Sequence, residues 1–330
     1  MSTSRGELAA GLRPMLATAG PLPASDDGWA YEMKWDGIRA LADISDGQVR
    51  LVSRLGREMT RAYPELHRLD PVPGWPEAVL DGEIVAFDAA GRPSFELLQQ
   101  RMHVTEPGRA ARLAARLPVT YLAFDVLVLD RRLLLEAAYA ERRSVLAGLG
   151  LPGPWWQVPP AFTRHRGADV LAASLEHGLE GVVAKRLASP YEPGGRSAAW
   201  RKIKNVHRQE VVVGGWKRGE GGRSGRVGSL LIGVHGRGLT GAAPGLQYAG
   251  HVGTGFTEGT LATLGRMLAP LRRDTAPFAS PVPAEHTRDV VWVEPQLVAE
   301  VEFARWTSAG RMRAASFKGL RPDRDPATVV

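Results

Sequence analysis

Lysine is scarce in this chain of 330 residues: only six of its 42 lysine and arginine residues are lysine. An ε-amine can lose its proton and act as a nucleophile, whereas a guanidinium stays charged. A chain that otherwise uses arginine is therefore expected to keep lysine where arginine cannot replace it. Four of the six lysines lie in three short segments, Lys34–Arg39, Glu180–Lys185 and Trp200–Lys204. This grouping predicts a lysine nucleophile among groups that bind phosphate and metal.

Lys34 is the candidate nucleophile. Side chains alternate along an extended strand, so Glu32, Lys34 and Asp36 are expected on one face. An amine attacks phosphorus only when it is neutral, and a reference pKa of about 10.4 leaves about one lysine in a thousand neutral near physiological pH. Nearby cations lower such a pKa, and we expect Arg39, a metal and the lysines of the third segment to supply them. A surface lysine in a hairpin turn is the alternative explanation.

Three carboxylates are candidates for binding a divalent cation or a sugar hydroxyl. Glu83 shares a strand face with Val85 and Phe87, where a carboxylate is either exposed at the strand's end or paired with a partner. Glu180 precedes a short apolar strand. Mg²⁺ prefers carboxylate oxygens, and a few acidic groups suffice where substrate phosphates complete its shell. The candidates are Asp36, Glu83 and Glu180, and the alternative is that these acids only balance charge.

Two basic segments are candidates for phosphate binding. Lys202 and Lys204 lie two residues apart, so on a strand they point to one side and repel each other unless an anion lies between them. A triphosphate suits this place, and Arg196 can join it. The glycine-rich basic segment Trp216–Arg226 is suited to follow a DNA backbone. A solvated basic edge strand and an exposed hairpin loop are the alternatives.

The composition is that of a soluble globular protein, with 44% hydrophobic and 23% charged residues. No apolar run is long enough to span a bilayer, and the N-terminal segment lacks the apolar core of a signal peptide. The absence of cysteine excludes disulfides and thiolate metal sites and fits a cytosolic protein. The net charge of +7 favours a polyanionic partner. Codon bias of a GC-rich genome is a second explanation for the arginine excess.

The pattern up to Asn205 predicts an α+β fold with antiparallel sheets, because strands and helices follow one another irregularly. The predicted strands are Tyr31–Lys34, Ile38–Ile44, Gln48–Ser53, Ala78–Phe87 and Tyr121–Leu129. The predicted helices are Pro107–Leu117, Tyr139–Leu149 and Ala168–His177, the last followed by Gly178 as a C′ glycine.

The pattern changes after Asn205. Five or so short strands surround one helix with leucines at 261, 264, 268 and 271, which favours a small β-barrel such as an OB-fold. The strands are expected at Val211–Val213, Val227–Val234, Leu246–Gly250 and Leu297–Phe303. We therefore predict two domains, residues 1–206 and 207–330.

The order of the motifs resembles that of the ATP-dependent DNA ligases within the covalent nucleotidyltransferases. These motifs are Lys34–Arg39, Ser53–Arg57, Leu80–Glu83, Ala123–Asp125, Glu180–Lys185 and Trp200–Lys204. The C-terminal half is most similar to the ligase domain of the bacterial ligase D enzymes, which are multifunctional end-joining enzymes that work with Ku. That similarity lies in Gly214–Lys217, Gly228–Leu231, Val298–Val301 and Phe317–Asp323. The resemblance implies an adenylation (nucleotidyltransferase) domain built on antiparallel sheets, followed by an OB-fold domain.

The resemblance also implies roles for individual residues. Lys34 would become covalently bound to AMP, with Glu32 near the adenine and Phe124 stacked on it. Glu83 would contact the ribose. The implied ligands of a catalytic Mg²⁺ or Mn²⁺ are Asp36, Glu83 and Glu180.

Basic residues would bind the phosphates. Arg39 and Arg54 are implied to contact the nucleotide sugar or the 5′-phosphate of the nick. The implied triphosphate ligands are Arg196, Lys202 and Lys204. Arg321, Asp323 and Arg324 match a C-terminal Arg-x-Asp-Lys element that orients pyrophosphate, with Arg324 in place of the lysine.

The implied function is ATP-dependent sealing of 5′-phosphate/3′-hydroxyl nicks in DNA through a lysine-AMP intermediate, in DNA repair, recombination or non-homologous end joining. The cofactors would be ATP and Mg²⁺ or Mn²⁺, and the partners nicked double-stranded DNA and Ku. We expect a monomer without membrane association, in the bacterial cytoplasm at the nucleoid. Polymerase and nuclease domains are absent, as expected either of a stand-alone homologue or of an excised domain, and the initial Met1 slightly favours the stand-alone homologue. The preferred metal and the tolerance for ribonucleotides stay open.

Two alternative functions are retained. An RNA ligase or an mRNA-capping-type nucleotidyltransferase also uses a Lys-x-Asp-Gly motif, although the ending Phe317–Arg324 favours the DNA enzyme. A non-catalytic OB-fold protein that binds DNA would explain the positive charge and the glycine-rich loop. It would leave Lys34, Glu83 and Glu180 without a role.

Overall fold

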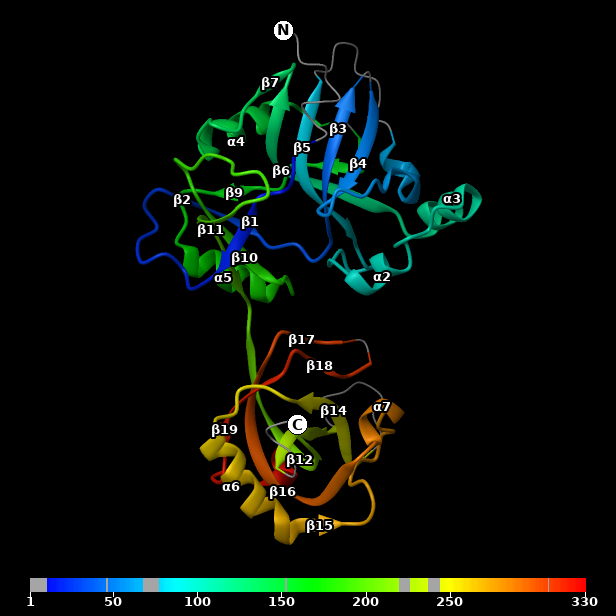
Figure 1. Ribbon diagram of the computed structural model, residues 1–330, viewed down its shortest axis with the longest axis vertical. Helices are drawn as coiled ribbons and strands as arrows, with labels where there is room; N and C mark the ends of the chain where they lie inside the picture. Colours follow the sequence, from blue (N-terminus) through cyan, green and yellow to red (C-terminus); the bar gives the residue numbers. More distant parts are fainter. Residues whose placement is uncertain are drawn as a thin grey trace. The chain divides into compact units, whose positions relative to one another are not determined.

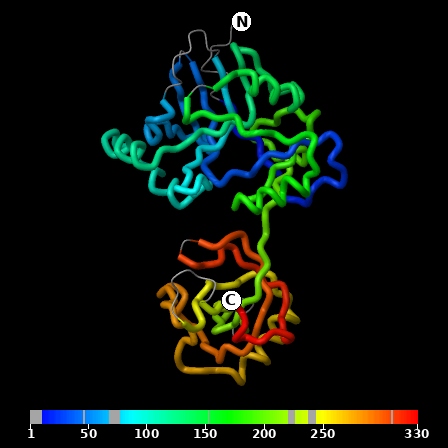
Figure 2. The backbone as a smooth tube through the Cα atoms, turned by 180° about the vertical axis from the view of Figure 1, so that it is seen from behind, coloured from blue at the N-terminus to red at the C-terminus, as the bar shows by residue number. Residues whose placement is uncertain are grey.

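The computed structural model describes residues 11–45, 47–67, 77–151, 153–219, 226–236, 244–307 and 309–330. The chain divides into two compact units, Met1–Asn205 and Val206–Val330, each with its own sheet structure (Figure 1). Figure 2 traces the single passage of the chain from one unit to the next. No helix among the described residues is long and apolar enough to cross a membrane.

The first unit contains two sheets. The strands of one are β3 (Ile38–Ser45), β4 (Gln48–Ser53), β5 (Ala78–Ala86), β6 (Val119–Leu129), β7 (Arg132–Leu133) and β8 (Trp156–Gln157). Their order is β4-β3-β5-β6-β7, and β8 also pairs with β6. β6 is buried on both faces, because Tyr121 and Ala123 pack in one core and Phe124 and Val128 in another. This double burial explains its almost continuously apolar sequence.

The second sheet of this unit carries the lysine-containing segments. Its strands are β1 (Leu16–Ala19), β2 (Trp29–Met33), β9 (Ala161–Phe162), β10 (Gly181–Arg186) and β11 (Arg196–Lys204). Their order is β1-β11-β10-β2-β9. This order brings the ends of β2, β10 and β11 together, although their sequences lie far apart.

Short helices and turns complete the first unit. The helices are α2 (Phe95–Gln99), α3 (Pro107–Arg116), α4 (Tyr139–Gly148) and α5 (Gly167–Glu176), with 3₁₀ turns η1 (Thr60–Ala62) and η2 (Pro64–Leu66). α4 packs on β6, and α5 packs on β10 and β2. The three predicted helices are thus present within one residue at each end. Gly178 has a φ of +68° directly after the cap residue His177, as a C′ glycine requires.

The sheets are antiparallel except at two places. β1 pairs with β11 in parallel, and β8 pairs with β6 in parallel. The prediction of antiparallel sheets therefore holds for the first unit except at these two short pairings. β1 and β8 have four and two residues, and segments this short leave no periodicity from which pairing can be predicted.

The described part of the second unit contains a six-stranded sheet, a separate two-stranded sheet and one long helix. Its elements are β12 (His207–Arg218), β13 (Val227–His235), β14 (Leu246–Val252), α6 (Glu258–Leu268), η5 (Ala269–Leu271), β15 (Arg272–Arg273), α7 (Ala284–Thr287), β16 (Val290–Phe303), β17 (Arg305–Trp306), β18 (Met312–Arg313), β19 (Ser316–Leu320) and η6 (Pro326–Thr328). The strand order of the larger sheet is β14-β13-β12-β16-β15, with β19 also on β16, and β17 and β18 form the two-stranded sheet. Leu261, Leu264 and Leu268 of α6 are buried in the core of this unit.

Three details differ from the sequence prediction. β12 extends over His207–Arg218, where only Val211–Val213 was predicted. Leu271 lies in the 3₁₀ turn that continues α6, rather than in the helix itself. β16 is twice as long as the predicted Leu297–Phe303 segment, because it continues past Pro295. The pairing of β12 with β16 shifts register between Val213 and Gly215, opposite this proline. A proline is tolerated there because a bulge does not need its missing N–H donor.

Candidate active site

A pocket of about 220 Å³ lies in the first unit and is lined by strands of both sheets. Eight of the predicted site residues line it, namely Glu32, Lys34, Arg39, Arg54, Glu83, Phe124, Arg196 and Lys202. Its other lining residues include Val183, Lys185 and Trp200. The pocket therefore gathers carboxylates, cations and an aromatic ring around the predicted nucleophile.

Lys34 lies just beyond the end of β2, where its N–H donates to Gly181 O at 2.8 Å. Its amine forms an ion pair with Glu180 Oε2, and 21% of its side chain is exposed. The expectation of one strand face for Glu32, Lys34 and Asp36 was wrong, because the strand ends at Met33. Lys34 still lines the pocket, because its backbone stays hydrogen-bonded to Gly181 at the start of β10 after β2 has ended.

Glu180 connects two of the lysine segments. Its Oε2 pairs with Lys34, and its Oε1 lies 2.7 Å from Lys204 Nζ. The backbone of Glu180 accepts a hydrogen bond from Asn205 N at 2.9 Å, so the carboxylate is held at the ends of β10 and β11. Burial raises the pKa of Glu180, but Lys34 and Lys204 outweigh it, and the pKa lies below its usual value.

The turn after Lys34 packs closely against β5. A Cβ on Gly37 would lie 2.3 Å from Ile84 O and 2.8 Å from Glu83 Cγ. Only glycine allows this approach, which places Glu83 beside the start of β3. Burial raises the pKa of Glu83 to about 7, against the opposing effect of Arg39 and Lys34. Glu83 therefore gives up its proton less readily than an exposed glutamate does.

Arg39 is held by a carboxylate below the pocket. Its Nε and Nη2 each lie 2.6 Å from an oxygen of Asp81, in a bidentate pair. Its guanidinium lies 4.5 Å from the ring centre of Phe124. The phenyl ring, which is 9% exposed, thus has a fixed orientation at the pocket wall.

The cations predicted to bind phosphate lie on β11. Burial lowers the pKa of Lys202, and Arg196, Lys204 and Lys34 lower it further by repulsion. Arg196 donates to Ala17 O at 2.8 Å while remaining exposed. Lys204 is 54% exposed and is held by Glu180 rather than lining the pocket. Repulsion between these cations would be relieved by a bound anion.

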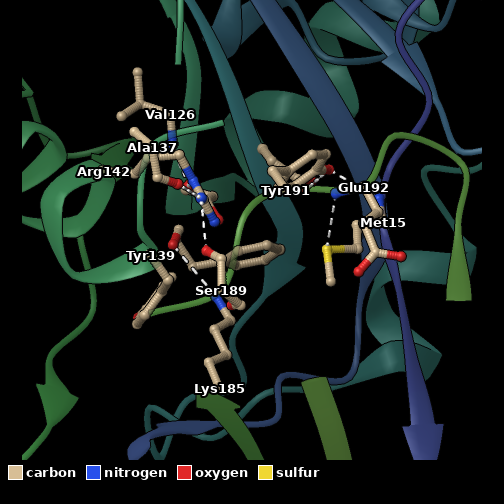
Figure 3. A network of polar contacts seen from close by, with 12 residues as sticks. Met15, Val126, Ala137, Tyr139, Arg142, Lys185, Ser189, Tyr191 and Glu192 are labelled. Carbon is tan, nitrogen blue, oxygen red and sulfur yellow. Dashed lines mark hydrogen bonds and ion pairs between the residues drawn. The ribbon is translucent and has the colours of Figure 1, made fainter. Parts of the chain in front are cut away.

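Glu32 belongs to a buried polar network. The carboxylate accepts a hydrogen bond from the hydroxyl of Tyr139 and lies 2.7 Å from Lys185 Nζ. Figure 3 shows Lys185, Tyr139 and Arg142 in one group of polar side chains. Arg142 belongs to a second buried pair, in which its Nε donates to Asp125 Oδ1 at 2.8 Å. Glu32 and Lys185 both line the pocket, so this network forms part of its wall.

Seven of the lining residues were not predicted as site residues, namely Leu16, Ala17, Met33, Trp35, Val183, Lys185 and Trp200. Val183, Lys185 and Trp200 carry no role in the predictions, although all lie in the lysine-containing motifs. Lys185 pairs across the sheet with Trp200, and Val183 shares its face of β10. The strand period of two and the rarity of lysine were the signals that pointed to them.

Several predicted residues lie outside the pocket lining. Asp36 is not among the described lining residues. Arg321 and Arg324 belong to the second unit, where both pair with Glu210, at 2.7 and 3.1 Å. Arg321 also binds Asp323 at 2.8 Å. Most of the glycine-rich segment, residues 220–225, lies outside the described residues.

The donor set fits a divalent cation only with help from a substrate. In the described part of the chain, no three His, Cys, Asp or Glu side chains lie close enough to hold a metal ion by themselves. Glu83 and Glu180 nevertheless offer carboxylate oxygens beside Lys34. Mg²⁺ is commonly bound by one or two carboxylates together with phosphates and water. The carboxylates therefore fit a cation that arrives with a phosphate group.

Comparison with known proteins assigns both units. The family described as ATP dependent DNA ligase domain matches residues 14–204, and the ATP dependent DNA ligase C terminal region matches residues 223–324. DNA ligase C1 of Mycolicibacterium smegmatis is 33% identical over 97% of this chain and 92% of that protein.

A second relative is longer. The multifunctional non-homologous end joining protein LigD of Mycobacterium bovis is 47% identical over 97% of this chain and 40% of that protein. The chain thus spans about 40% of the length of this relative. A solved structure of mycobacterial DNA ligase D complexed with ATP and MES has a TM-score of 0.56 at 43% identity, over 98% of this chain and 99% of that chain.

These matches confirm the fold prediction, a nucleotidyltransferase unit followed by an OB-fold unit. They include relatives matched along nearly their whole length, and they extend over both compact units. The chain belongs to the ATP-dependent DNA ligase family.

Proposed function

We propose that this chain seals nicks in double-stranded DNA with ATP, through an AMP covalently bound to Lys34. The observation that carries this proposal is the position of Lys34, which pairs with Glu180 and lines one pocket with Glu83 and two cations of β11, Arg196 and Lys202. A surface lysine in a hairpin turn would not bring these groups together. In this reading residues 1–206 form the adenylation domain and residues 207–330 the OB-fold domain.

The first step forms the adduct. Lys34 Nζ attacks the α-phosphorus of ATP, an N–P bond forms, and the bond to the β-phosphate oxygen breaks so that pyrophosphate leaves. The Lys34 ammonium must first give up a proton, to water or to the Glu180 carboxylate beside it, because an ammonium has no lone pair for attack. Arg196 and Lys202 offset the negative charge of the phosphates. The reaction depends on in-line positioning more than on proton transfer.

The remaining steps transfer AMP and seal the strand. A 5′-phosphate of the nick displaces Lys34 from the AMP phosphorus, and a 3′-hydroxyl then displaces AMP to form the phosphodiester. Arg54, exposed at the edge of the pocket, and Arg39 would contact the 5′-phosphate or the nucleotide sugar. Arg321 and Arg324 would orient pyrophosphate during the first step. Their ion pairs with Glu210 would then have to rearrange.

A divalent cation, Mg²⁺ or Mn²⁺, would neutralise phosphate charge when bound. Glu83 and Glu180 would hold it, with Asp36 as the third predicted ligand. Glu32 and Phe124 would contact the adenine, and Glu83 the ribose.

The biological setting is proposed from the relatives. LigD of Mycobacterium bovis is a multifunctional non-homologous end joining protein, so we propose DNA repair by end joining as the setting, with Ku as a partner. We propose a monomer in the bacterial cytoplasm, at the nucleoid.

Mass spectrometry after incubation with ATP tests the chemistry. We expect an increase by one AMP, and peptide mapping should place it on Lys34. Parallel incubations with GTP, and with nicked DNA and nicked RNA, separate this function from a capping-type enzyme or an RNA ligase. An AMP on another residue, or none at all, would contradict the proposal.

A further inference from the structure

Lys185 is a buried lysine to which the proposed reaction gives no role. It is 1% exposed, and its amine lies 2.7 Å from Glu32 Oε2. The amine also faces the ring centres of Trp200, Phe124 and Tyr139 at 4.2, 4.5 and 4.9 Å. Burial lowers the pKa of Lys185, and the Glu32 carboxylate opposes this shift. A cation enclosed in this way is costly, so its presence calls for an explanation.

The network fixes both oxygens of the Glu32 carboxylate. Oε1 accepts a hydrogen bond from the hydroxyl of Tyr139 on α4, and Oε2 pairs with Lys185 on β10. Each carboxylate oxygen has two acceptor positions, so each oxygen keeps one for a ligand. Glu32 is 5% exposed and lines the pocket. Its remaining acceptor positions are therefore available only to a group inside that pocket.

Sheet register sets this geometry. Glu32 of β2 lies opposite Val183 of β10, and Lys185 follows two residues later on the same face. Lys185 in turn lies opposite Trp200 of β11. The ammonium is a compact point charge that fits between the rings, whereas a guanidinium is larger and planar. This explains why an arginine-rich chain keeps a lysine here.

We propose that Lys185 is a positioning residue for base selection. Together with Tyr139 it holds the Glu32 carboxylate in place, so that the pocket favours a base with an amino group over one with a carbonyl. The inference rests on the proposed function, in which Glu32 faces the adenine. A charged carboxylate can only accept hydrogen bonds. The 6-amino group of adenine can donate to it, whereas the 6-carbonyl of guanine would repel it. Without the lysine, Oε2 of Glu32 would lose the partner that orients it, and the carboxylate would no longer be held for this contact.

The test compares two nucleotides that differ in one group. Single-turnover formation of Lys34-AMP, or its analogue, is measured with ATP and with purine riboside triphosphate, which lacks the 6-amino group. We expect Lys185→Met to reduce the preference for ATP about tenfold, the loss of one charge-assisted hydrogen bond. The matched control is Arg186→Met, on the same strand and exposed, and it should keep the wild-type ratio. An equal loss with both nucleotides would indicate a structural role only and overturn the inference.

A double variant shows whether Lys185 acts through Glu32. Once Glu32→Gln has removed the carboxylate, adding Lys185→Met should leave the nucleotide ratio unchanged. A further tenfold fall in the double variant would overturn the inference. Should Lys185→Met fail to fold by circular dichroism, Tyr139→Phe replaces it, since that change removes only the hydroxyl on Oε1. Tyr139→Phe should lower the ratio of adduct formation with ATP to that with purine riboside triphosphate by less than tenfold. An unchanged ratio would contradict the inference.

The same assay separates the two proposals. A wild-type chain that forms no adduct with either nucleotide refutes the proposed function, and this inference with it. A wild-type chain that forms the adduct, with Lys185→Met losing both nucleotides equally, refutes only the inference.

Discussion

Two of the lysines that line the pocket form ion pairs with glutamates. Lys34 pairs with Glu180, and Lys185 pairs with Glu32. Lys34 and Glu180 have 21% and 23% of their side chains exposed. Lys185 and Glu32 have only 2% and 7% exposed. In the buried pair, Glu32 lies on β2 and Lys185 on β10. In the other pair, Lys34 directly follows β2 and Glu180 directly precedes β10. The two pairs therefore have the same chemistry and differ in burial.

Burial decides what each pair can do. Water reaches the half-buried Lys34–Glu180 pair and can replace either partner, and pairs that water reaches are worth about 0–1 kcal/mol. Opening a buried pair leaves an uncompensated charge and costs about 3–5 kcal/mol. Lys34 can therefore leave Glu180 to react, whereas Lys185 must stay with Glu32. In the proposed reaction, the same residue types would thus serve as a nucleophile in one pair and as a fixed support in the other.

The largest expected effect comes from replacing the nucleophile and keeping its charge. Lys34→Arg can retain an ion pair with Glu180, but a guanidinium does not become neutral and cannot form the adduct. We expect complete loss of protein-AMP by mass spectrometry, with the melting temperature unchanged within about 2 °C. An adduct at the wild-type level would place the nucleophile elsewhere and remove the contrast between the pairs.

The second prediction compares the stability of the two pairs. Lys185→Met should lower the free energy of unfolding by about 3–5 kcal/mol, because it leaves Glu32 buried without its cation. Lys34→Met should lower it by less than about 1 kcal/mol. Urea denaturation of both variants measures the difference. Equal losses would show that burial does not distinguish the pairs.

A third, smaller effect concerns the pH dependence of stability. The pKa of Glu83 rises from 4.5 to about 7 in the folded chain, because burial disfavours the charged form. Between these values the unfolded chain gives up a proton that the folded chain keeps, so Glu83 lowers stability as pH rises through this window. Glu83→Gln should match the wild type near pH ~4 and melt about 2–4 °C higher near pH ~8. Thermal melts across this range measure the gap, and a gap that narrows with rising pH would contradict the shift.

The smallest effect is expected at the exposed partner of Glu180. Lys204 is 54% exposed, so Lys204→Ala should leave the melting temperature unchanged. It removes one of two cations from Glu180 and one neighbour that repels Lys202, so we expect a modest loss of adduct formation, about two- to tenfold. Single-turnover assays with ATP measure it. A loss as complete as that of Lys34→Arg would mean that Lys204 has a direct role in the reaction.

Much of the first unit follows from local patterns. The Lys34–Arg39 turn, the three helices and the central strands are present near their predicted residues, because alternation and capping signals act over a few residues. The short strands β1 and β8 were missed, and their parallel pairing with them, because four or two residues carry no period. β16 was predicted too short, since Pro295 breaks the apolar pattern although a register shift accommodates it.

The candidate site divides in the same way. The scarcity of lysine and the order of the motifs identified Lys34 and most of the lining residues from the sequence alone, because residue type limits which chemistry is possible. Only the tertiary structure decided that Glu180 pairs with Lys34 and Glu32 with Lys185. Ion pairs and hydrogen bonds act over a few ångströms, and the order of the strands, rather than distance along the chain, sets which groups come that close. The sheet also leaves Lys34 partly exposed to water and buries Lys185. In the proposed reaction, this difference decides which lysine can act as the nucleophile.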